Sequence, residues 1–142
     1  MSNTIVSMAH KEGCDMGLRL KKTSGYDNIY EVDCFQQEFE DVLKEKNNNG
    51  RYHKWLRREL SILDELGRRS LQFRDFEYIE NTNPKLYAIR YPKSINNPRV
   101  IFIFKEGNMV ILLNTFKESS KNKYESAITI AENRLNNLEV LE

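Results

Sequence analysis

The sequence predicts a single small α+β domain, in which a small antiparallel β-sheet is packed by an N-terminal helical hairpin and a C-terminal helix. Three observations lead to this prediction. The chain has 142 residues, which suits one domain with a core of its own. Two segments with helical periodicity flank the break at residues 47–50, and apolar strands joined by short turns follow between residues 86 and 116.

Residues 1–25 form an N-terminal extension whose order the pattern leaves open. Met16, Leu18 and Leu20 alternate with small or charged residues, which favours a short, half-buried strand, and a turn is expected at 23–25. The extension is either an extra strand or a tail that becomes ordered against a partner. We therefore place the domain itself at residues 26–142.

A strand and a helical pair follow the extension. β-Branched and aromatic residues predict a strand over 29–35, and apolar residues at three- and four-residue spacing predict a helix over 36–46. The most regular helix is expected over 51–66, where an apolar stripe lies opposite a charged face and Gly67 occupies the position of a C-terminal cap. Two helices joined by so short a turn pack side by side and cover one face of a sheet.

The rest of the sheet is expected after a polar and aromatic connector at 68–85. Strands are predicted over 86–91, 99–105 and 109–116, and the uninterrupted apolar run of the second is typical of a central strand covered on both faces. The short turns between these strands favour antiparallel pairing. A last helix is predicted over 124–140.

Composition and charge narrow the classes of function. The chain does not open on a basic region followed by an apolar run, and no apolar stretch approaches the roughly 20 residues of a membrane span, so we expect a cytoplasmic protein with no membrane partner. Residues 85–124 hold eight basic and two acidic side chains, a net charge of +6, which leaves −5 for the rest of a chain whose total is +1. Such a basic half either meets a polyanion or is a solvated surface that discourages aggregation.

Several motifs in the last third of the chain occur in a recognisable order. An aromatic strand ends in Arg, a second Arg opens the next strand, a hydrophobic strand ends in Phe and Lys, and the last helix carries Ala and Arg on one face. The segments concerned are Leu86-Tyr87-Ala88-Ile89-Arg90, Asn97 to Phe104, Leu112 to Lys117, Lys121, Tyr124 to Ala127, Ala131 and Arg134. Together with the order of elements over about residues 29–138, they resemble the RelE/ParE/HigB superfamily of toxins, and within it the HigB-like, phage-derived branch.

The resemblance implies the toxin of a type II toxin–antitoxin system, an endoribonuclease that cuts messenger RNA on the ribosome with no metal and no cofactor. Relatives of this kind use the RNA's own 2′-hydroxyl as nucleophile. The protein must then accept the hydroxyl proton, donate to the leaving oxygen and stabilise charge on the phosphorane. The expected partners are the ribosome, mRNA and a cognate antitoxin, itself expected to be a helix-turn-helix protein.

Four residues are candidates for the catalytic site. Arg99 matches the family's strand-opening arginine and is the first candidate for stabilising phosphate, since a guanidinium presents a rigid, charged fork to phosphate oxygens. Arg90 lies on the strand expected beside it, and Lys117 ends the last strand, within expected reach of the same pocket. Tyr124 matches a position where some family members place a tyrosine, either stacked on a base or near the scissile phosphate.

Structural interpretations compete with these roles. Arg99 could cover apolar surface with its aliphatic stem, and Tyr124 could simply pack at the start of the last helix. Arg90 could pair with a helix carboxylate such as Glu40 or Asp41.

A further set of basic residues suits substrate binding better than catalysis. The candidates for RNA binding are Lys85, Lys93, Lys121 and Lys123, the last two in the loop expected before the final helix. No metal site is expected, because the histidines and cysteines show no recognised ligand spacing; they are His10, Cys14, Cys34 and His53.

Two departures from the family pattern leave other functions open. Glu118-Ser119-Ser120 interrupts what is often a run of lysines, and residues 1–25 have no counterpart in minimal members. A ParE-like toxin that poisons DNA gyrase would share the fold. A catalytically inactive, phage-derived relative that acts as a binding module would tolerate the interrupted run. The basic face favours RNA cleavage.

Overall fold

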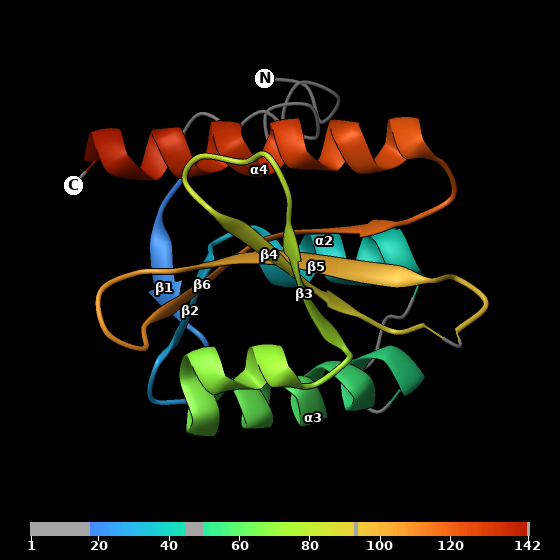
Figure 1. Ribbon diagram of the computed structural model, residues 1–142, viewed down its shortest axis with the longest axis horizontal. Coiled ribbons are helices and arrows are strands. Elements are labelled where there is room, and N and C mark those ends of the chain that lie inside the picture. The colour runs from blue at the N-terminus through green and yellow to red at the C-terminus, as the bar shows by residue number, and fades with distance from the viewer. Residues whose placement is uncertain (1–17, 45–49, 93, 142) are drawn as a thin grey trace, which may run out of the picture.

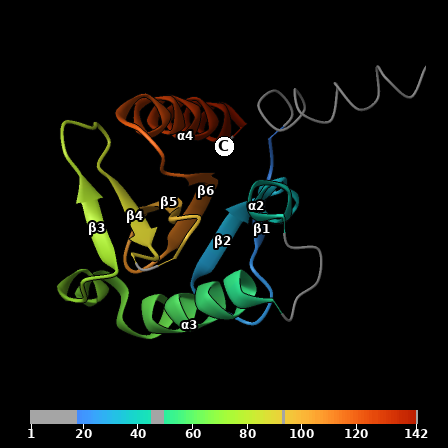
Figure 2. The same ribbon diagram turned by 90° about the vertical axis from the view of Figure 1, so that its right-hand side faces the viewer.

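The computed structural model describes residues 18–44, 50–92 and 94–141, and the side chains up to residue 138 (Figure 1). A mixed β-sheet forms the middle layer. Figure 2 shows helix α4 along one face of this sheet and helix α3 along the other. The predicted α+β class is therefore confirmed. None of the helices in the described part of the chain is both long and apolar enough to cross a membrane.

The sheet has six strands in the order β1-β2-β6-β5-β4-β3. Their bounds are β1 Leu20–Lys22, β2 Ile29–Val32, β3 Phe76–Ile79, β4 Leu86–Arg90, β5 Pro98–Phe104 and β6 Val110–Lys117. The predicted antiparallel meander is confirmed for β4, β5 and β6. Strand β2 pairs with β6 in parallel, so the sheet is mixed rather than purely antiparallel. Of the two alternatives for the extension, the described part shows the strand, because β1 pairs with β2.

Strand β3 is the element that sequence reasoning missed, since its residues fall in the predicted connector. It is a short edge strand that pairs only with β4. Phe76 and Ile79 are buried while Tyr78 is exposed, so the four residues show too little alternation to stand out from a loop. Strand β3 carries Glu77, an acidic residue that lies next to β4 and its Arg90.

The helices are α2 Phe35–Leu43, α3 Arg51–Leu66 and α4 Lys121–Leu141, with a 3₁₀ turn over Gly67–Gln72. Gly67 ends α3 as predicted: its φ is +57° and its N–H donates to the Leu63 carbonyl. Helix α4 begins earlier than expected. The Ser120 hydroxyl accepts from the Lys123 N–H at 3.3 Å, and this cap places Lys121 and Lys123 in the first turn rather than in a loop.

Helix α4 is fixed over the sheet by apolar packing and by one buried arginine. Ala127, Ala131 and Leu135 face the sheet. Arg134, 5% exposed, donates to both carboxylate oxygens of Glu38 in α2 at 3.0 and 2.7 Å and to the Leu113 carbonyl at 2.8 Å. These bonds join α4, α2 and β6, and so set where the first turn of α4 lies over the sheet.

Candidate functional site

Two arginines face each other across the β4–β5 pair. Arg90 is directly opposite Arg99 in the register, and Arg99 is also opposite Phe116 of β6. Directly paired residues point to the same face of a sheet. The predicted adjacency of the two arginine strands is therefore confirmed, and both side chains lie on the face covered by α4.

Both ends of the Arg99 guanidinium are occupied by carboxylates. Its Nη1 pairs with Glu77 of β3 and its Nη2 pairs with Glu118, which follows β6. The Arg90 Nη1 lies 3.3 Å from the other oxygen of Glu77. Arg90 therefore has a carboxylate partner, but that partner is the strand residue Glu77 and not the expected Glu40 or Asp41.

Tyr124 closes the cluster from the first turns of α4. Its hydroxyl donates to Glu77 at 3.1 Å, and its ring packs edge-on against Phe116 with centroids 5.4 Å apart. The Arg99 guanidinium carbon lies 5.8 Å from the ring centroid. Burial, followed by the negative charge of Glu77, raises the pKa of Tyr124 above its usual value. The hydroxyl therefore stays protonated and acts as a hydrogen-bond donor.

The cluster is small and polar, and Arg99 is its least exposed charged member. The Arg99 side chain is 11% exposed, and within the described residues the buried Nε atoms of Arg90 and Arg99 have no acceptor. Two guanidinium groups and two carboxylates give it no net formal charge. The basic half of the sequence thus does not produce a net positive charge at the arginines themselves.

Glu77 and Glu118 are the members of the cluster that sequence reasoning missed. Glu77 could have been found only by recognising β3 as a strand next to β4. Glu118 stands out in the sequence as an interruption of a lysine run, but nothing in the local sequence indicates its contact with Arg99. That contact depends on the register that brings the ends of β5 and β6 together.

The other candidate residues lie outside this cluster. Lys117 pairs with Pro98, so it points to the opposite face from Arg99, on the side of α3. Lys85 precedes β4, and its Nζ lies 4.7 Å over the ring of Tyr78. Lys121 and Lys123 are exposed on the first turn of α4, close in sequence to Tyr124. Lys93 lies outside the described residues.

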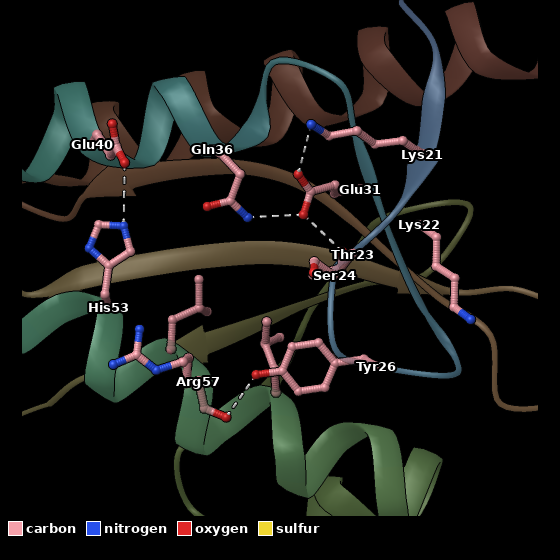
Figure 3. Close-up of a pocket in the computed structure, with 12 residues that line it drawn as sticks. Lys21, Lys22, Thr23, Ser24, Tyr26, Glu31, Gln36, Glu40, His53 and Arg57 are labelled. Carbon is pink, nitrogen blue, oxygen red and sulfur yellow. Dashed lines mark hydrogen bonds and ion pairs between the residues drawn. The ribbon is translucent and has the colours of Figure 1, made fainter. Parts of the chain in front are cut away.

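A separate polar pocket of about 460 Å³ lies between the β1–β2 hairpin and helices α2 and α3 (Figure 3). The buried Glu31 accepts from Thr23 at 2.8 Å and from Gln36 at 3.0 Å, which ties the hairpin to α2. His53 of α3 points toward Glu40 of α2, with 3.6 Å between nitrogen and carboxylate oxygen. None of the predicted site residues lines this pocket, and its contacts hold elements together.

Metal-ligand clusters are not present in the part of the chain that the structure describes: no three His, Cys, Asp or Glu side chains converge there. His10 and Cys14, two of the four residues weighed for a metal, lie outside that part. The groups of the Arg99 cluster themselves offer three kinds of chemistry. Two guanidinium forks can bind an anion, a carboxylate can accept a proton, and a phenol can donate a hydrogen bond.

Comparison with known proteins identifies one family. The sequence pattern described as "Phage derived protein Gp49-like (DUF891)" matches residues 53–136, from the first turn of α3 to a position within α4. The match therefore includes all the residues of the Arg99 cluster. No curated protein and no solved structure matches the chain.

Proteins of the Gp49-like family are toxins that pair with a cognate antitoxin. Because the match covers more than half of the chain, the protein belongs to the Gp49-like family of phage-derived proteins, within the RelE/HigB-type toxin superfamily.

Proposed function

We propose that this toxin is a ribosome-dependent mRNA endonuclease of a type II toxin–antitoxin system. The observation that carries the proposal is the convergence of Arg90, Arg99, Glu77 and Tyr124 on one face of the sheet. These side chains together offer the three functions that transesterification of RNA needs: a proton acceptor, a hydrogen-bond donor and positive charge for the phosphorane.

In the proposed reaction the RNA 2′-oxygen attacks the adjacent phosphorus while the bond from phosphorus to the 5′-oxygen breaks. The 2′-hydroxyl proton passes to the Glu77 carboxylate. Arg99 and Arg90 stabilise the charge on the phosphorane. The Tyr124 hydroxyl gives its proton to the departing 5′-oxygen, and the proton held by Glu77 then passes to the Tyr124 oxygen along their hydrogen bond. The products are a 2′,3′-cyclic phosphate and a 5′-hydroxyl, so atoms and charge balance without a metal or cofactor.

The RNA would extend from this site over basic residues at two places. Lys121 and Lys123 are exposed on the α4 turn that carries Tyr124, where they can contact the backbone. Lys85 and Tyr78 form a cation–aromatic pair at the β3 edge of the sheet, where Tyr78 points to the face opposite Glu77, so an RNA strand reaches the pair by passing around this edge. Tyr78 is 57% exposed, so its ring can stack on an unpaired base. Lys93 remains a predicted contact.

The antitoxin would act by covering this surface, and we retain the expectation that it is a helix-turn-helix protein. The toxin itself is expected to act in the cytoplasm. The contacts of Arg99 with two carboxylates favour a second candidate function. A toxin-like relative without cleavage activity would keep the antitoxin interface while its arginines remain paired internally.

Induction of the protein in growing cells, followed by mapping of mRNA 5′ ends, tests the proposal. We expect new 5′-hydroxyl ends in phase with codons from the unsubstituted protein and none from Arg99→Ala. Lys54→Ala, an exposed change on α3, is the matched control and should cleave normally. DNA damage without phased cuts would replace the proposal with the gyrase-poisoning alternative, and the absence of both effects would favour the inactive relative.

A further inference from the structure

We propose that Glu118 occupies the phosphate-binding position of Arg99 in the free protein, and that an RNA phosphodiester binds there only by displacing the Glu118 carboxylate. This inference deepens the proposed function and rests on it for the identity of the substrate. It assigns a substrate-competing role to a residue that lies outside the expected catalytic set.

The occupancy of Arg99 is the first observation. A guanidinium binds a phosphate through two parallel N–H bonds, and a carboxylate presents the same pair of oxygens. Here Nη1 already pairs with Glu77 and Nη2 with Glu118. An incoming phosphate therefore finds a carboxylate at each Nη, and within the described residues the buried Nε is the Arg99 nitrogen without an acceptor, so two-point binding requires that one carboxylate leave.

Glu118 is the carboxylate that can leave. Glu77 receives three contacts, from Arg90, Arg99 and Tyr124, whereas within the described residues the Glu118 carboxylate pairs with Arg99. The Glu118 and Glu77 side chains are similarly exposed, 27% and 29%, so both carboxylates border solvent and the number of contacts distinguishes them. Glu77 is fixed by its strand and its network, while Glu118 follows the end of β6.

The backbone of Glu118 stays in place while its side chain moves. Its N–H donates to the Asn97 carbonyl at 3.1 Å, and its carbonyl accepts from the Asn97 side chain at 3.4 Å. Asn97 immediately precedes β5, the strand of Arg99. This pair of bonds keeps the carboxylate within reach of Arg99, so that Glu118 returns once the anion departs.

Electrostatics explain why the competition affects a phosphodiester in particular. With Glu118 in place the four charged groups of the cluster sum to zero, and with the Glu118 charge removed they sum to +1. The Arg99 side chain is 11% exposed, and charge interactions at such a partly buried group are screened less than at the surface. An anion of the phosphate class should therefore bind more tightly as soon as Glu118 is neutralised.

The test uses inorganic pyrophosphate as a probe, because it does not depend on RNA cleavage. Titration at low ionic strength would follow the Arg99 Nε–Hε signal by NMR, assigned through its loss in Arg99→Lys. We expect Glu118→Gln to bind pyrophosphate at least tenfold more tightly than the unsubstituted protein. Glu125→Gln, an exposed change on α4, removes the same charge outside the cluster and should leave the affinity near that of the unsubstituted protein.

A second variant and a second ligand keep the outcomes distinct. Glu118→Ala should also tighten pyrophosphate binding, and its thermal unfolding curve reports whether the fold is kept. For a single-stranded RNA, the affinity of Glu118→Gln should fall more steeply with salt concentration than that of the unsubstituted protein. The difference in slope should correspond to about one additional phosphate contact. Equal pyrophosphate affinities in the unsubstituted protein and Glu118→Gln would overturn the inference. If Glu118→Gln binds pyrophosphate more tightly but the unsubstituted protein does not cleave mRNA, only the proposed function is overturned.

Discussion

Glu118, immediately after β6, forms an ion pair with Arg99 in β5. Glu118 is the residue that interrupts the lysine run typical of the family, and Arg99 is the residue that matches the family's strand-opening arginine. A lysine at this place would have added positive charge beside Arg99. The glutamate instead neutralises it. The interrupted lysine run is thus part of the candidate site, and it decides how much positive charge an RNA phosphate meets there.

Arg90 and Lys117 should differ sharply in their effect on cleavage. Arg90 shares the α4 face with Arg99, whereas Lys117 points to the α3 face because it pairs with Pro98. We expect Arg90→Ala to lower the cleavage rate by about 100-fold, the usual effect of losing one charge-stabilising group, and Lys117→Ala by less than about threefold. Cleavage of mRNA in a ribosome-containing extract measures both. Equal losses would contradict the assignment of faces.

Substitution of Tyr124 by Phe separates its two possible roles in the reaction. The variant keeps the ring and its edge contact with Phe116 but loses the hydroxyl that donates to Glu77. If the hydroxyl donates to the leaving oxygen, as we propose, cleavage should fall by about 100-fold with RNA binding unchanged. Single-turnover cleavage and RNA binding, measured on the same samples, check this. Unchanged cleavage by Tyr124→Phe together with weaker RNA binding by Tyr124→Ala would instead assign the residue to stacking.

Stability should depend on pH through Glu59, a buried residue of α3. Burial, then the charge of Asp75 and a hydrogen bond with it, raises the pKa of Glu59 to about 7. In the unfolded chain the pKa lies near 4.5, so between these values the folded state holds a proton that the unfolded state has released. Stability should therefore fall as pH rises through this window and level off above about 7.

The comparison with Glu59→Gln isolates this contribution. Because glutamine does not ionise, the stability of the variant should lack the part of the decline with pH that comes from Glu59. The urea midpoint of the variant, minus that of the unsubstituted protein, should therefore increase between pH 4.5 and 7. Urea unfolding at half-unit intervals from pH 4 to 8 would show it. Parallel curves for the two proteins would contradict the raised pKa.

Arg134→Lys should destabilise the fold although it conserves charge. The guanidinium of Arg134 donates to both oxygens of Glu38 and to the Leu113 carbonyl in a buried setting. A lysine ammonium cannot reproduce that planar arrangement. We expect a loss of about 1–3 kcal/mol in the free energy of unfolding. Denaturant unfolding measures the loss, and Arg69→Lys, at an exposed position, should change the free energy by less than about 0.5 kcal/mol. Equal stabilities would show that Arg134 does not fix α4.

The sequence by itself determined the elements with strong periodicity or long apolar runs. Helix α3 has the predicted bounds, β5 is buried along its whole length, and the Arg90 and Arg99 strands are neighbours as expected. These features follow from local patterns, because burial of an apolar stripe or run dictates the period of the residues that form it. The family resemblance rested on the same segments.

Tertiary structure alone decided which charges meet. The partners of Arg99 come from β3, which has no distinctive local pattern, and from the end of β6, whose position depends on the β5–β6 register. A one-residue change in strand register reverses which side chains share a face, so Lys117 and Glu118 could be told apart only in the folded sheet. The positive site expected from the sequence is for this physical reason a cluster with no net charge, in which Glu118 faces Arg99.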